Sequence, residues 1–184
     1  MSAIHEHVLQ NGMTLLCWPQ RHLHGLEFGL YLKGGPLYET EETQGISNLL
    51  EHLCFRGLGG LNREGLLREL NRFGTNLDAA TYAEGLVFRL KCLPRFFDAA
   101  LEYFLRFFAN VAWTPEQIAA EKQVVLRQLE ADGDGDLFDR AACDFRRTEN
   151  GAFPPLGTPE SLMALYREKL GFYSCSVPLF DQYV

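Results

Sequence analysis

The chain has 184 residues, of which 47% are hydrophobic and 22% are charged, and this balance excludes a disordered or fibrous protein. Its formal net charge of −7 leaves no chain-wide basic surface for nucleic acid. The five cysteines are odd in number and form no CxxC pair, which argues against a disulfide framework and a cysteine zinc site. The chain begins without a signal-peptide pattern and has no run of about 18 apolar residues, so we expect a cytoplasmic protein without membrane contact.

Three strands are predicted at the start of the chain. Asn11-Gly12 separates two apolar runs between residues 8 and 18, which predicts a hairpin because both residues accept a positive φ. Residues 26–33 alternate apolar and polar side chains with a period of two, so we expect a strand with one buried face. The polar residues 39–44 are then predicted to form a loop.

Two helices and a further strand region are predicted next. Leu49, Leu50, Leu53 and Phe55 follow a helical spacing, and the glycines from residue 57 are expected to end that helix. Asn62 is a predicted N-cap for a second helix that runs to about residue 73. Residues 77–90 alternate again, which predicts a strand or hairpin with a bend at Gly85.

The second half of the chain is predicted to be helical. Pro94 suits the first turn of a helix whose apolar stripe, rich in phenylalanine, predicts a largely buried element. Thr114-Pro115 is expected to begin a long helix. Helices are also predicted over residues 137–147 and, after Thr158-Pro159, to about residue 170. With no internal repeat or linker, residues 1–184 are interpreted as a single domain, or as the N-terminal half of a larger two-domain protein.

One pentapeptide carries the chemical information. Asn48, Glu51 and His52 stand at positions i, i+3 and i+4 of the predicted helix, so they share one face and can converge on a ligand. With histidine in place of Asn48 the segment would be HxxEH. In this respect the chain resembles the pitrilysin/insulinase (M16) family of zinc peptidases, whose motif supplies two histidine ligands and a glutamate base.

The resemblance extends from about residue 8 to residue 173. Gly45-Ile46-Ser47 and Phe55-Arg56-Gly57 are similar to the segments that flank the family's motif. Residues 74–84 resemble its glycine and NAxT segment, although Asp78 occupies the asparagine position. Residues 121–128 resemble its ExxVVLxE helix, and residues 153–157 and Phe172-Tyr173 resemble later landmarks.

The resemblance implies roles for individual residues. Glu51 matches the catalytic base, Glu121 a glutamate that supports the zinc ligands, and His52 one ligand. Asn48 and Gln128 replace the other two ligands, and neutral amide oxygens are weak zinc donors. One interpretation is that these five residues form a hydrogen-bonded polar cluster between two helices; residual zinc binding and a different metal are the alternatives.

Other candidate sites have simpler interpretations. Asp132, Asp134 and Asp136 lack the glycine and the glutamate of a calcium loop, so a solvated loop is favoured. The four histidines at positions 5, 7, 22 and 24 are predicted to be exposed. Cys54 is predicted to be a packed apolar residue rather than a nucleophile.

The predicted fold is α+β, a mostly antiparallel sheet with helices packed on one face, which the resemblance makes M16 metallopeptidase-like (LuxS/MPP-like). It also implies peptide binding at the edge strand near residues 81–88, with Thr81, Tyr82, Ala83 and Glu84 as the candidate residues. The leading hypothesis is a catalytically inactive binding or partner subunit without a cofactor. It would bind a peptide, an active M16 subunit or a second copy of itself. The alternative is a zinc metalloendopeptidase whose missing ligands come from other residues or a partner chain.

Overall fold

The computed structural model describes residues 3–58, 61–109, 113–131 and 153–165. Within these ranges the elements follow one another as β1 (His5–Val8), β2 (Thr14–Cys17), β3 (Leu26–Lys33), η1 (Pro36–Tyr38), α1 (Ile46–Cys54), β4 (Gly57–Leu58), β5 (Leu61–Asn62), α2 (Arg63–Arg72), β6 (Leu77–Tyr82), β7 (Gly85–Cys92), η2 (Pro94–Phe96), α3 (Phe97–Ala109), α4 (Pro115–Ala131) and α6 (Pro159–Ala164). None of the helices in these ranges is both long and apolar enough to cross a bilayer.

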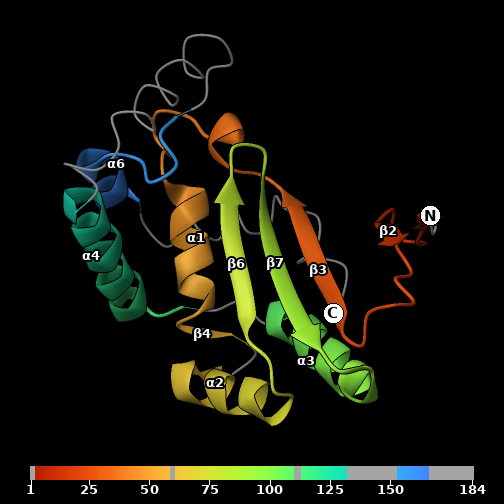
Figure 1. The fold of residues 1–184 in the computed structure, drawn as a ribbon. Coiled ribbons are helices and arrows are strands. Elements are labelled where there is room, and N and C mark those ends of the chain that lie inside the picture. Colours follow the sequence, from red (N-terminus) through yellow and green to blue (C-terminus); the bar gives the residue numbers. More distant parts are fainter. Residues whose placement is uncertain (1–2, 59–60, 110–112, 132–152, 166–184) are drawn as a thin grey trace.

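The central sheet has three antiparallel strands in the order β3, β7, β6 (Figure 1). Alternate residues of β7, from Leu86 through Phe88 and Leu90 to Cys92, are buried, while Arg89 and Lys91 between them are exposed. The register places Leu30 of β3 opposite Phe88, on the same buried face. This confirms the predicted antiparallel sheet with one apolar face.

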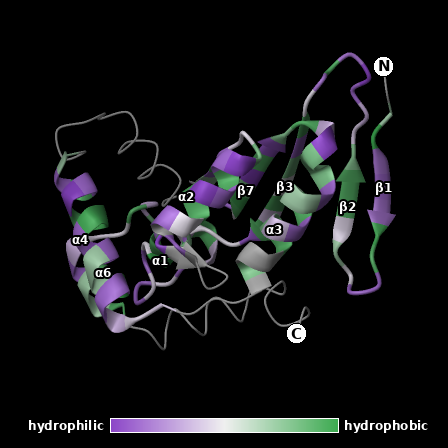
Figure 2. Cartoon of the chain, turned by 90° about the horizontal axis from the view of Figure 1, so that it is seen from below, coloured by the Kyte–Doolittle hydropathy of each residue, from purple (hydrophilic) through white to green (hydrophobic). Residues whose placement is uncertain are grey.

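Helices cover the apolar face of this sheet. Phe104 and Phe108 of α3 make edge-to-face contacts with Phe28 of β3 and Phe88 of β7, at centroid distances of 5.2 Å and 5.0 Å. α1 packs through a mostly apolar inner side, where Ile46, Leu49 and Leu53 are completely buried. Figure 2 shows the resulting pattern, in which hydrophilic residues lie on the outer side of the helices.

Helix starts agree with the predicted caps. The Asn62 side chain accepts a hydrogen bond from Gly65 N at 2.9 Å and begins α2. Thr114 and Gln117 exchange side-chain to backbone hydrogen bonds at the start of α4, as in a capping box. Thr158 forms the same arrangement with Ser161 at the start of α6. These local contacts explain why the helix starts could be predicted from the sequence.

Several predictions were inexact. Pro94 begins a short 3-10 helix, and α3 starts only at Phe97. α3 is not buried on all sides, because Leu105 is 47% exposed. The glycines after α1 do more than end it, since Gly57–Leu58 pairs with Leu61–Asn62 in a short ladder. The predicted helix over residues 137–147, the aspartates at 132–136 and the end of the last helix lie outside the described residues.

The N-terminal hairpin stands beside the main sheet. β1 and β2 pair antiparallel around Asn11-Gly12, as predicted, but every residue of both strands is exposed. The hairpin lies on the β3 side of the sheet, at the end of the molecule opposite α4 (Figures 1 and 2). Within the described residues neither strand pairs with β3. The hairpin therefore adds no strand to the central sheet.

Candidate functional site

The start of α1 is fixed by a buried carboxylate. Glu39, which is only 7% exposed, accepts hydrogen bonds from Gly45 N at 2.8 Å and Ser47 N at 3.0 Å. Gly45 adopts a φ of 81°, a left-handed conformation that favours glycine, and Leu156 O lies too close to admit a Cβ. Burial raises the pKa of Glu39, although the hydrogen bonds from Ser47 and Gly45 oppose this shift. The sequence predicted only a polar loop here and missed this residue.

α1 and α4 meet through three charged or titratable side chains. His52 Nδ1 lies 3.1 Å from Glu121 Oε1, and Arg56 Nε donates a hydrogen bond to Glu121 Oε2. The Glu121 side chain is 7% exposed, against 22% for His52 and 33% for Arg56. Burial alone would raise the pKa of Glu121, but the hydrogen bonds from His52 and Arg56 and the charge of Arg56 outweigh it and lower that pKa. Both carboxylate oxygens of Glu121 are thus engaged.

Glu51 forms its hydrogen bond with a residue of the sheet rather than with a residue of α4. Thr81 Oγ1 of β6 donates a hydrogen bond to Glu51 Oε2. This contact is possible because Thr81 lies on the face of β6 that packs against α1. No contact of Glu51 Oε1 with another described residue is formed. Glu51 therefore keeps one carboxylate oxygen available.

A hollow of about 260 Å³ joins these groups. Its walls combine the charged and titratable side chains with two apolar ones, and they are formed by Glu51, His52, Phe55, Arg56, Glu121 and Val124. The sequence analysis predicted that Glu51, His52 and Glu121 are neighbours, and all three line this hollow. Arg56 was recognised only as part of a flanking segment, although its position four residues after His52 on the same helical face was the available signal.

The predicted five-residue cluster is wrong for two of its members. Asn48 is buried, at 9% exposure, but its Oδ1 atom has no hydrogen-bond partner among the described residues. Gln128 is exposed on α4, and no hydrogen bond joins it to the described residues. It stands two helical turns after Glu121 on α4 and is not among the residues that line the hollow. The tertiary packing therefore leaves both amides outside the hydrogen-bonded group.

The donors at this site do not fit a zinc ion. Within the described ranges no three histidine, cysteine or acidic side chains are grouped so as to hold a metal. Glu121 is engaged by His52 and Arg56, and the remaining positions carry the amides of Asn48 and Gln128. His52 alone supplies an imidazole, whereas catalytic zinc sites in proteins use three protein ligands drawn from histidine, cysteine and carboxylate side chains. We therefore derive no step through a metal.

The predicted edge strand near residues 81–88 is wrong in its bounds, because residues 83–84 form a turn and residues 85–88 belong to the central strand β7. The candidate peptide-binding residues lie at the end of β6 and in this turn. Tyr82 and Glu84 are exposed, while Thr81 and Ala83 are half-buried. Ala83 O accepts a hydrogen bond from Leu37 N at 3.0 Å, and Glu84 O accepts one from Tyr31 Oη at 3.0 Å. The carbonyl groups of the turn are thus used within the molecule, whereas among the strands of the described ranges β6 pairs only with β7.

The structure confirms the simpler interpretations of Cys54 and of the four N-terminal histidines. Cys54 is buried at 4% exposure, and this burial raises the pKa of its thiol, which excludes a reactive thiolate. His5, His7, His22 and His24 are all exposed. The calcium-loop candidates at positions 132–136 fall outside the described residues.

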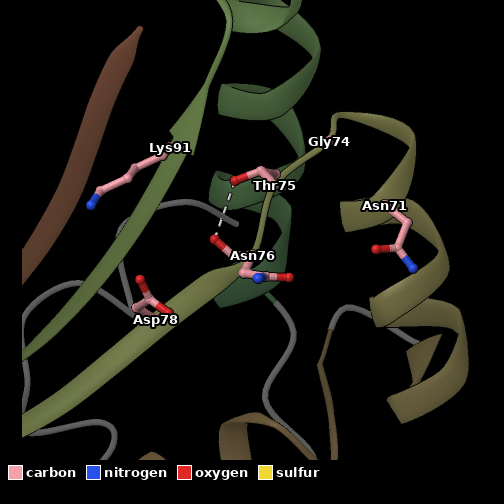
Figure 3. Close-up of a pocket in the computed structure, with 6 residues that line it drawn as sticks. All are labelled: Asn71, Gly74, Thr75, Asn76, Asp78 and Lys91. Atoms are coloured by element: carbon pink, nitrogen blue, oxygen red, sulfur yellow. Dashed lines mark hydrogen bonds between the residues drawn. The ribbon is translucent and has the colours of Figure 1, made fainter.

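A second and larger hollow, of about 410 Å³, lies at the end of α2 and is lined by Asn71, Gly74, Thr75, Asn76, Asp78 and Lys91 (Figure 3). Its walls are mostly neutral polar groups, and Thr75 Oγ1 donates to Asn76 O at 3.2 Å. Lys91 is paired with Glu27 at 3.4 Å. This larger hollow holds no nucleophile next to a base, so the smaller hollow beside α1 is the better candidate site.

Comparison with known proteins places the sequence in context. A family model described as Insulinase (Peptidase family M16) matches residues 24–147. An "Uncharacterized zinc protease" of Rickettsia felis is 27% identical over 163 residues, covering 87% of this chain and 40% of that protein. The mitochondrial-processing peptidase subunit beta of Lentinula edodes is 28% identical over 169 residues, covering 90% and 36%. The chain thus spans about two fifths of the length of these curated relatives.

Solved structures show the same fold. A protease from Helicobacter pylori matches with a TM-score of 0.85 at 18% identity, covering 96% of this chain and 44% of that one. A peptidase M16 inactive domain from Pseudomonas fluorescens matches with a TM-score of 0.81 at 14% identity, covering 94% and 43%. At such low identities these matches speak for the fold alone.

Proposed function

Because the chain belongs to the insulinase (M16) peptidase family, as the sequence resemblance predicted, we propose that it is a catalytically inactive member that binds a peptide or protein partner. The proposal rests on one contrast: the helices keep the arrangement of the family's site, but two of the three zinc-ligand positions carry amides. α1 and α4 hold Glu51, His52 and Glu121 around one hollow, yet Asn48 and Gln128 offer only neutral amides. Such donors bind zinc weakly, so the hollow has no means of activating a water molecule.

The retained side chains have a structural role in this proposal. Glu121 ties α4 to α1 through His52 and Arg56, and Glu51 ties α1 to β6 through Thr81. A glutamate without a metal-activated water has little to do as a general base. The same contacts keep the hollow beside the β6 edge in a fixed shape. The site is therefore suited to binding rather than to hydrolysis.

The edge of β6 is the proposed binding strand. β6 has a ladder partner only in β7 within the described residues, so its other edge offers backbone groups to an extended peptide. Thr81 and Tyr82 belong to this strand, while the carbonyls of Ala83 and Glu84 are occupied by Leu37 and Tyr31. We therefore place the peptide contacts at Thr81 and Tyr82, with Ala83 and Glu84 shaping the end of the strand.

A protein partner is supported by the N-terminal hairpin. The register pairs Glu6 with Leu16 and Val8 with Thr14, so these side chains share one face, next to exposed Ile4. Ile4, Val8 and Leu16 are 62%, 60% and 64% exposed. Neighbouring exposed apolar side chains of this kind mark interaction surfaces. The related Lentinula edodes protein is itself named as a subunit, which is consistent with a domain that works beside another chain.

Zinc stoichiometry tests the proposal against its alternative, a zinc endopeptidase completed by other residues or by a partner chain. The protein is equilibrated with micromolar zinc, and bound metal is measured by elemental analysis. We expect well under one zinc per chain and no difference between the wild type, His52→Ala and the control His24→Ala. One zinc per chain that is lost only in His52→Ala, together with cleavage of added peptides, would establish the alternative.

A further inference from the structure

The hollow beside α1 carries an uncompensated negative charge. Of the two carboxylates in its walls, Glu121 is neutralised by Arg56, whereas the hydrogen bond that Glu51 accepts among the described residues comes from the neutral hydroxyl of Thr81. With His52 neutral, the six lining residues carry a net charge of −1, from two glutamates and one arginine. An anion is therefore disfavoured in this hollow, and a cation is favoured.

Unused hydrogen-bond acceptors lie on the same side of α1. The Oδ1 atom of Asn48 is buried and has no partner among the described residues, and Asn48 shares its helical face with Glu51 and His52. Glu51 Oε1 is the second free acceptor. An acceptor that stays unpaired in the protein interior lowers stability, which applies to the buried Asn48 Oδ1. Glu51 is half-buried and lines the hollow, so its Oε1 atom is the acceptor that a ligand bringing donors can reach.

The chemistry of these acceptors favours an organic cation over a metal. Calcium and magnesium need about six oxygen ligands, far more than Glu51 and Asn48 provide. A divalent ion would also be repelled by the Arg56 guanidinium in the same wall. A primary ammonium carries three donors and one charge, and its alkyl chain can lie against the apolar side chains of Phe55 and Val124.

We propose that the hollow formed by Glu51, His52, Phe55, Arg56, Glu121 and Val124 binds a primary ammonium group of a peptide laid along β6. This inference rests on the proposed function, since it identifies the ligand of the same site. Glu51 is the charged acceptor, and Thr81, which belongs to β6, orients its carboxylate. The ammonium comes from a lysine side chain or from the peptide's amino terminus, because both present the same chemistry.

Three synthetic probes separate these sources. Each is a seven-residue peptide of alternating valine and threonine around a central residue, with an amidated carboxyl end. The first has a central lysine and an acetylated amino end, the second a central Nε-acetyl-lysine and an acetylated amino end, and the third a central Nε-acetyl-lysine and a free amino end. Binding to the full chain is measured by titration calorimetry, and mass spectrometry of the recovered probes reports any cleavage.

We expect the first or the third probe to bind about tenfold more tightly than the doubly acetylated second one, as one charge-assisted hydrogen bond implies. Glu51→Gln should remove this preference. Glu130→Gln, which removes an equal charge from an exposed position on α4, should keep it. Thermal melting establishes that both variants are folded.

Equal affinity for all three probes, or a preference that survives Glu51→Gln, would overturn the ammonium site while leaving a non-catalytic peptide-binding domain intact. Absence of binding by every probe would overturn it as well. Zinc-dependent cleavage of the probes is a different outcome, since it would contradict the proposed function itself. The two failures are thus distinguishable in one set of measurements.

Discussion

Glu121 of α4 binds one residue of α1 and one residue of the turn that follows it, with His52 Nδ1 at 3.1 Å from its Oε1 and Arg56 donating to its Oε2. These contacts join Glu121 to residues that precede it by 69 and 65 positions in the chain. Glu121 thus orients His52 through one ring nitrogen, in the way that a carboxylate usually orients a metal-bound histidine. Here Arg56 supplies the positive charge beside Glu121.

The ionised Glu121 should stabilise the fold only above its ordinary pKa. An acid whose pKa is lowered on folding contributes stability at neutral pH and loses that contribution as the pH falls through its folded pKa. We expect the difference in free energy of unfolding between wild type and Glu121→Gln to shrink as the pH falls below 4.5. Denaturant unfolding from pH 3 to 7 measures it, and a difference independent of pH would contradict the assigned ion pair.

Removing Arg56 should be costly because it leaves Glu121 buried without its cation. We expect Arg56→Ala to lower the free energy of unfolding at pH 7 by about 1–3 kcal/mol, a discounted value because Arg56 is 33% exposed. Arg68→Ala, an exposed arginine on α2, is the control and should change stability by less than about 0.5 kcal/mol. Equal effects of the two substitutions would show that the Arg56–Glu121 pair contributes nothing.

The Glu39 carboxylate should stabilise α1 most at low pH. Glu39→Ala removes the acceptor of Gly45 N and Ser47 N and should cost about 1–2 kcal/mol. Because burial raises the pKa of Glu39, its contribution is largest below 4.5 and declines as the pH rises through the raised value. The stability difference between wild type and Glu39→Ala, measured from pH 4 to 8, should fall accordingly, with the exposed Glu41→Ala as control. A difference that grows with pH would contradict this sign.

Asn48 should be a source of instability in the protein without ligand. Leucine has nearly the same size and no acceptor to leave unpaired, so Asn48→Leu should raise the free energy of unfolding by about 1 kcal/mol. Chemical denaturation measures the change, and Asn71→Leu at an exposed position of α2 serves as control. A marked loss of stability in Asn48→Leu would mean that its amide is satisfied in solution.

Restoring the two missing ligand types should restore metal binding. The double variant Asn48→His with Gln128→Glu adds an imidazole and a carboxylate to His52, which completes a three-ligand set for zinc. We expect bound zinc to rise to about one per chain by elemental analysis, and a further His52→Ala substitution to remove it. If the double variant gains no zinc, α1 and α4 do not bring these positions to one point.

Part of the fold follows from the sequence because its determinants are local. Period-two alternation specified β3, and short-range hydrogen bonds of Asn62, Thr114 and Thr158 specified three helix starts. The spacing of Asn48, Glu51 and His52 placed them on one helical face, since that depends only on helical geometry. The family resemblance was confirmed by the match over residues 24–147.

Other features depend on contacts between distant segments, and only the tertiary structure decided them. Arg56 and Thr81 reach Glu121 and Glu51 across separations of 65 and 30 residues. The burial of Glu39 against the start of α1 and the exposure of Gln128 on α4 are likewise properties of the folded chain. Sequence spacing fixes which side chains share a helical face, but hydrogen-bond partners and burial are set by the packing of elements against one another, because that packing decides which polar groups lose contact with water.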